Sequence, residues 1–151
     1  MMALLIGLGV GLGVGALGLL SGMQRERAFY AVILITVGTY YVLFAAMGAP
    51  AALGMEILIA TGFALVALVG FKSSRWLVAA GLLAHAGLDA SHGLLVINAG
   101  VPAWWPAFCG AADVGLAGWL GMSLLLEARG SVRKAEMLEG LERAKGIEPS
   151  S

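Results

Sequence analysis

The sequence is poor in charge and in cysteine, and these shortages exclude several classes of protein. Only 12% of the 151 residues are charged and the formal net charge is zero, so the chain offers no basic face for nucleic acid. The single cysteine, Cys109, excludes an internal disulfide and a metal site built from several thiolates. With 60% hydrophobic residues and a mean hydropathy of +0.94, a soluble domain of this size could not bury its apolar surface. We therefore expect an integral membrane protein with one domain and the lipid bilayer as its main partner.

Five apolar segments are each about long enough to cross ~30 Å of hydrocarbon as a helix. The expected spans are residues 2–20, 28–47, 51–71, 76–96 and 107–126. The predicted fold class is thus all-α, an integral membrane bundle of five transmembrane helices within residues 1–127. Residues 128–151 are predicted to form a short charged tail.

Basic residues indicate the orientation of the bundle. All nine Lys and Arg residues lie in three stretches, 25–27, 72–75 and 129–145. With five spans these stretches share one side of the membrane, and the other side has no basic residue. Because basic loops stay in the cytoplasm, the N-terminus is expected outside and the tail in the cytoplasm.

The tail has two parts. Residues Ser131–Arg143 are expected to form one short helix with Ser131 as its N-cap. The end of the chain, Leu141–Ser151, reads LERAKGIEPSS. It resembles the peptide made when a reading frame runs into a transfer-RNA gene, which implies that these last residues have no function.

Glycines recur at every fourth position of the first apolar segment. One row is Gly7, Gly11 and Gly15 (the first glycine row), and the other is Gly9 and Gly13 (the second glycine row). Small residues at this spacing let two helices approach closely. The rows predict either close packing inside the bundle or contact between copies in a homo-oligomer.

Ionisable side chains interrupt the last two apolar segments in a regular pattern. His85, Asp89 and His92 are spaced i, i+4 and i+7, so on a helix they lie within about 40° of one another. Cys109 and Asp113 repeat the i, i+4 spacing on the next segment. Each such group costs about 2.5–3.5 kcal/mol at mid-depth in a membrane. The pattern therefore predicts a functional site.

Depth in the membrane predicts that residues of four spans meet. At ~1.5 Å per residue, Glu56, Asp89 and Asp113 come to about 8–10 Å below the outer surface. Tyr40 and Tyr41 reach a similar depth. We expect these residues to surround one polar cavity that opens outward. Rigid and amphipathic residues are expected to form a lid over its mouth, namely Pro102, Trp104, Trp105 and Pro106.

The polar pattern resembles that of a family of small bacterial multi-pass membrane proteins of unknown function. It reads His85-x3-Asp89-x2-His92, then a loop with Pro102, then Cys109-x3-Asp113. Residues 100–109, GVPAWWPAFC, are especially similar. Some members carry a second histidine at the position of Gly93. The resemblance implies a location in the bacterial inner (plasma) membrane, but no activity.

The first interpretation of the site is a metal centre. His85, Asp89 and His92 would be the primary ligands, with Glu56 or Asp113 as the fourth ligand or a general base. Such mixed nitrogen and oxygen donors suit zinc or iron. A metal open to the outside could activate water for hydrolysis of a lipid or another amphiphile.

Two other interpretations remain open. Acids without a basic neighbour at their depth cannot all be ionised cheaply, so the residues could bind protons or a cationic solute. Alternatively, Asp89 could bond a histidine, and Asp113 a tyrosine or the backbone, only to hold helices together at about 0.6 kcal/mol per bond. Cys109 is expected to be a small packing residue.

Overall fold

The computed structural model describes residues 1–144, and the regular secondary structure within them consists of helices without strands. The helices are α1 (Met2–Ser21), α2 (Ala28–Gly48), α3 (Leu53–Lys72), α4 (Arg75–Leu95) and α5 (Trp105–Ala144). Short 3-10 turns at Met23–Arg25 and Pro50–Ala52 lie between the first helices. The all-α class is confirmed.

Four of the helices, α1, α2, α3 and α5, are long and apolar enough to cross a membrane. This composition is consistent with a membrane protein. Helix α4 has 21 residues, which is a sufficient length, but its polar residues lower its hydropathy. The number of spans and their orientation therefore stay a prediction.

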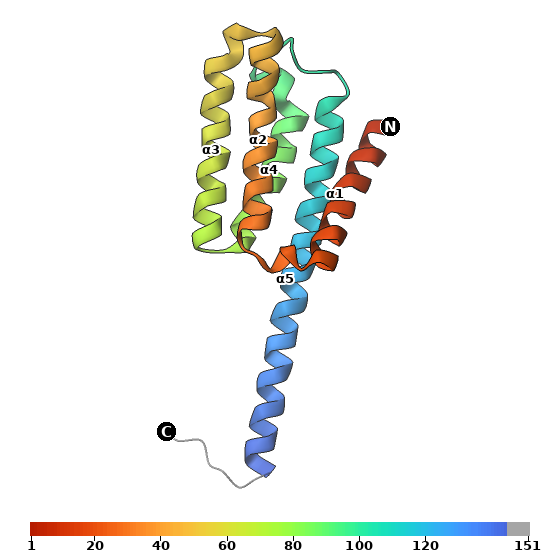
Figure 1. The fold of residues 1–151 in the computed structure, drawn as a ribbon, viewed down its shortest axis with the longest axis vertical. Helices are drawn as coiled ribbons and strands as arrows, with labels where there is room; N and C mark the ends of the chain where they lie inside the picture. The colour runs from red at the N-terminus through yellow and green to blue at the C-terminus, as the bar shows by residue number, and fades with distance from the viewer. Residues whose placement is uncertain (145–151) are drawn as a thin grey trace.

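The helices run alternately up and down, so successive connections lie at opposite ends of the bundle (Figure 1). The α1–α2 turn, the α3–α4 turn and the long continuation of α5 share one end, the basic end. There the Arg27 Nη2 donates a hydrogen bond to the Ser73 carbonyl at 3.0 Å, and Arg75 pairs with Glu127. The basic stretches thus lie together, as the predicted topology requires.

The first glycine row packs α1 against α5. A Cβ atom at Gly7 would lie 2.1 Å from the Phe108 carbonyl oxygen, and one at Gly11 would lie 2.2 Å from the Ala112 carbonyl oxygen. Only glycine permits this approach of two backbones. In the second glycine row, a Cβ would meet no atom within 4 Å. The first row therefore serves internal packing.

Two apolar clusters lie along the bundle, one near each end. The larger is nearer the basic end and is centred on Leu34, Leu82 and Leu120, which are at most 1% exposed. The smaller, at the opposite end, contains Ala45 and Val96. The polar residues predicted to form a site lie between these clusters.

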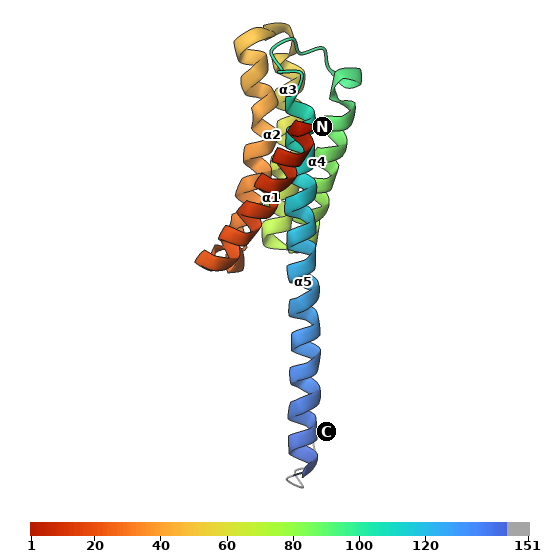
Figure 2. The same ribbon diagram turned by 90° about the vertical axis from the view of Figure 1, so that its right-hand side faces the viewer.

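Helix α5 continues without a break far beyond the bundle (Figures 1 and 2). The prediction of a separate helix capped by Ser131 is wrong, because the Ser131 hydroxyl donates to the Ala128 carbonyl at 2.8 Å inside α5. Residues from Glu127 onward are rich in Glu, Ala, Arg, Leu and Lys, which favour helix, and an existing helix adds turns easily. The expectation that the end of the chain has no function falls mostly on residues 145–151, outside the described part.

Candidate functional site

Helix α4 turns all three of its predicted site residues inward. His85, Asp89 and His92 are 0%, 3% and 3% exposed. The i, i+4, i+7 spacing puts them on one face, and that face packs towards α2, α3 and α5. Seven residues of helix also separate the two histidines by about 10 Å along the axis. They consequently belong to two different groups of side chains.

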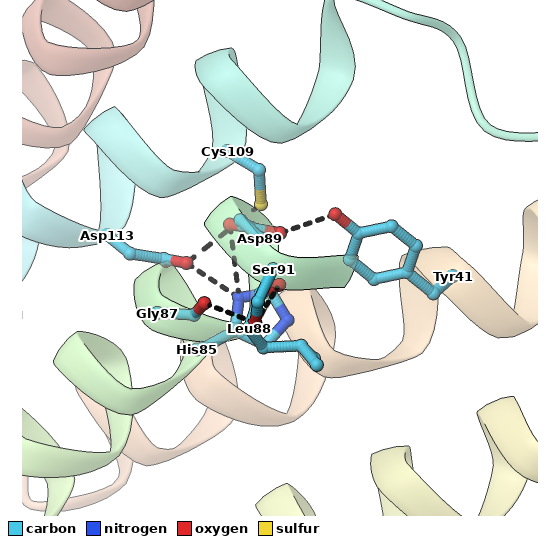
Figure 3. Close-up of polar contacts among 8 residues, drawn as sticks. All are labelled: Tyr41, His85, Gly87, Leu88, Asp89, Ser91, Cys109 and Asp113. Carbon is cyan, nitrogen blue, oxygen red and sulfur yellow. Dashed lines mark hydrogen bonds and ion pairs between the residues drawn. The ribbon is translucent and has the colours of Figure 1, made fainter. Parts of the chain in front are cut away.

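The first group, the aspartate–histidine cluster, consists of His85, Asp89, Cys109 and Asp113 (Figure 3). The His85 Nδ1 lies 2.7 Å from the Asp113 Oδ2 and 3.6 Å from the Asp89 Oδ2. The Cys109 Sγ lies 4.0 Å from the Asp113 Oδ2. One ligand atom from each of the four buried residues falls within 4.8 Å of the others. The cluster thus joins α4 to α5 through groups that can bind a metal ion.

The second group, the glutamate–histidine cluster, joins α3, α4 and the α4–α5 connection. The His92 Nε2 lies 2.8 Å from the Glu56 Oε1. Asn98 donates to the same Glu56 oxygen at 2.8 Å and to the Tyr41 carbonyl at 3.1 Å. The Asn98 Oδ1 in turn accepts from the Gly100 amide at 3.2 Å. Asn98 was not among the predicted site residues; its only sequence signal is an amide side chain directly after an apolar span.

Tyr41 connects the two clusters. Its hydroxyl donates to the Asp89 Oδ1 at 2.6 Å, and its ring stacks on that of His92 with centroids 3.8 Å apart. Tyr41 is 1% exposed. Tyr40, expected at the same depth, instead packs its ring edge-on against Trp105. Adjacent residues of a helix point about 100° apart, so only one of the two tyrosines can face the site.

Several buried polar atoms of the described residues lack a hydrogen-bond partner. Within the aspartate–histidine cluster these are the His85 Nε2, the Asp89 Oδ2 and the Asp113 Oδ1. An unsatisfied buried group costs about 1–3 kcal/mol, and most buried polar groups in proteins are paired. The two carboxylate oxygens are therefore open to a ligand, whereas the His85 Nε2 lies on the opposite side of its ring from the Nδ1 that faces Asp113.

The structure divides the predicted metal ligands between the clusters. His85 and Asp89 lie together as expected, and Asp113, a predicted fourth ligand, joins them. His92 and Glu56 pair with each other instead, because His92 lies too far along α4 from His85 to reach the same ion. Cys109, counted in the polar pattern but expected to pack and not to bind a metal, lies beside Asp113.

Of the four residues predicted to form a lid, the two prolines line grooves of the bundle, and the two tryptophans line neither of these grooves. A groove of about 300 Å³ reaches His92 and is lined by Pro102 and Pro106. Trp105 is half-buried and packs on aromatic rings of α2, whereas Trp104 is 54% exposed. A second groove of about 570 Å³ reaches Asp89. The polar side chains therefore pair with one another in the interior, and access to them comes from two sides.

No protein-family model, no curated protein and no solved structure matches the chain. The resemblance to a bacterial membrane family of unknown function stays a prediction, and the function of the chain has to be argued from its own site.

Proposed function

We propose that this protein binds one divalent transition-metal ion, most suitably zinc, at the aspartate–histidine cluster inside a membrane. The observation that carries the proposal is the convergence of four ligand atoms from His85, Asp89, Cys109 and Asp113 within 4.8 Å. Imidazole nitrogen, carboxylate oxygen and cysteine sulfur are the three donor types that zinc takes in proteins. Iron accepts the same nitrogen and oxygen donors and is the second choice.

The ligand atoms are separated by distances on the scale of a tetrahedral centre, although one pair lies closer together than a bound ion requires. Metal–ligand bonds of about 2.0–2.3 Å put neighbouring ligand atoms roughly 3.3–3.8 Å apart. The His85 Nδ1 lies 2.7 Å from the Asp113 Oδ2 and 3.6 Å from the Asp89 Oδ2, so small side-chain movements suffice to admit an ion.

Charge supports the same assignment. A dication bound by two aspartates and a neutral imidazole has no net charge, which matters because isolated charges are costly in hydrocarbon. We assign His85, Asp89 and Asp113 as the primary ligands; Cys109 in the fourth position would bind as a thiolate and leave one negative charge on the site. If Cys109 stays outside the coordination shell, the open position lets the metal polarise a bound oxygen and assist hydrolysis.

The metal content of matched histidine variants tests the proposal. The purified protein in detergent should contain near-stoichiometric zinc or iron by elemental analysis. His85→Ala should bind it at least about 100-fold more weakly, since even outer-shell changes cost about 10–100-fold, whereas His92→Ala should retain it. A native protein without metal after zinc and iron supplementation would contradict the proposal. Loss of metal in both His85→Ala and His92→Ala would favour the ligand set expected from sequence.

A proton-binding function is the second candidate, and the carboxylate count favours it. Glu56, Asp89 and Asp113 face only two imidazoles, and of these acids two bond histidine directly at 2.7 and 2.8 Å. Without a metal, neutrality of the site requires one further proton. A metal-free protein whose melting temperature depends on pH, and loses this dependence in Asp89→Ala, would support this alternative.

We further propose five membrane spans, with the N-terminus outside and the C-terminus in the cytoplasm, in a bacterial inner membrane. Support comes from the alternating helices and the shared end of the basic residues (Figure 1). A fluorescent protein fused after the last residue should fluoresce, and alkaline phosphatase inserted at the α2–α3 turn should be active. Active phosphatase at the α3–α4 turn would contradict this orientation.

A further inference from the structure

The larger groove is lined mostly by residues of α1, α4 and α5. Its volume of about 570 Å³ is within the range of about 300–1,000 Å³ that is usual for small-molecule sites. Leucines of α1, including Leu4, line one side, and small residues of α4 and α5, such as Ala86, Ala107 and Gly110, line the rest. Asp89 is the one charged residue in this lining. The groove is thus apolar apart from one carboxylate, that of Asp89.

The free oxygen of Asp89 lies directly behind Gly110. A Cβ atom at Gly110 would be 3.5 Å from the Asp89 Oδ2, and both residues line the groove. The other oxygen, Oδ1, already accepts from Tyr41, whereas Oδ2 has no hydrogen-bond partner. The side chain of Asp89 is 1% exposed. A group that enters the groove therefore comes close to one buried acceptor whose nearest donor, the His85 Nδ1, is 3.6 Å away.

We propose that this groove admits, from the side of the bilayer, a lipid with a free hydroxyl group, and that the hydroxyl bonds to Asp89. The inference rests on the proposed membrane placement and names the ligand class of the proposed site. The acyl chain matches the apolar lining, and Leu4, 49% exposed at the groove edge, then faces lipid. A hydroxyl donates to a bare carboxylate and also offers an oxygen ligand to a bound metal. The same headgroup therefore suits the cluster with or without an ion.

Photolabelling of the protein in phosphatidylcholine nanodiscs tests the inference. The probe is a monoacylglycerol with a diazirine in its acyl chain, and the reference probe is a hydrocarbon of equal length without hydroxyls. Mass spectrometry should locate the monoacylglycerol label on the groove-lining parts of α1 and α5, with much less label from the hydrocarbon. Equal labelling by the two probes would overturn the hydroxyl requirement.

A pair of glycine variants on α5 provides the matched control. In Gly110→Ala the new methyl covers the Asp89 Oδ2, with its closest other contact at 3.3 Å to the Asp89 Cβ. Monoacylglycerol labelling should fall about tenfold or more, because a hydrogen bond to a charged group is lost. Gly118→Ala, where a Cβ meets nothing within 4 Å, should label as the native protein does. Equal labelling in the two variants would overturn the inference.

The labelling and the metal content are measured on the same samples, and together they separate a failure of this inference from a failure of the metal proposal. Gly110→Ala is expected to keep its metal because glycine is no ligand. Metal-free samples with an intact labelling difference would contradict only the metal site. If the melting temperature shows that Gly110→Ala is misfolded, Ala107→Leu replaces it, because the leucine side chain fills the same groove. Its monoacylglycerol labelling should fall in the same way.

Discussion

Valine in place of Gly11 is expected to separate α1 from α5 and to cause a large loss of stability. The Cβ would lie 2.2 Å from the Ala112 carbonyl oxygen and 3.0 Å from its carbon. These are backbone atoms, so no side chain can move aside and the helices themselves must part. Overpacking costs about 1–3 kcal/mol or more, and with this backbone clash we expect at least about 3 kcal/mol, which is roughly 6–12 °C in melting temperature for a chain of this size.

Gly13→Val is the control for this result. It is the same substitution in the same helix, and a Cβ at Gly13 meets nothing within 4 Å. Thermal unfolding in detergent, followed by tryptophan fluorescence, should therefore show a much smaller change. Equal melting temperatures for the two variants would contradict the assigned packing face. A larger effect at Gly13 would instead indicate that the second glycine row is a contact between copies in a homo-oligomer.

Removal of the Glu56 side chain is expected to give the second large effect. In Glu56→Ala, His92 and Asn98 both lose the oxygen to which they bond at 2.8 Å. Each buried donor that is left without its acceptor costs about 1–3 kcal/mol. Because these bonds connect α3, α4 and the α4–α5 connection, the whole end of the bundle opposite the basic end should loosen. The melting temperature of the variant in detergent measures the loss.

Glu56→Gln distinguishes hydrogen bonding from charge at this position. The amide oxygen can still accept from both partners, so this variant should recover most of the stability that Glu56→Ala loses. Glu136→Ala, at an exposed position of α5, should change stability by no more than about 0.5 kcal/mol. A Glu56→Ala protein as stable as the native one would show that the glutamate–histidine cluster does not hold the bundle together.

Local patterns predicted much of the architecture. Helix class and approximate helix positions follow from the length of the apolar runs, and the shared end of the basic stretches follows from their alternation with those runs. The inward face of α4 also follows from sequence, because the spacing of His85, Asp89 and His92 fixes their relative directions on any helix. These features depend on residues close together in the chain.

The composition of the site, in contrast, required the tertiary structure. That Asp113 accompanies His85 depends on how α5 is rotated and shifted against α4, and no local periodicity reports this. The same holds for the partnership of Glu56 with His92 and for Asn98, whose role arises from a connection between helices. Sequence alone thus determined that polar groups enter the bundle and on which helical faces, because helix geometry is local. Only the packing between distant segments decided which of these polar groups meet, because this packing depends on the mutual fit of whole helix surfaces.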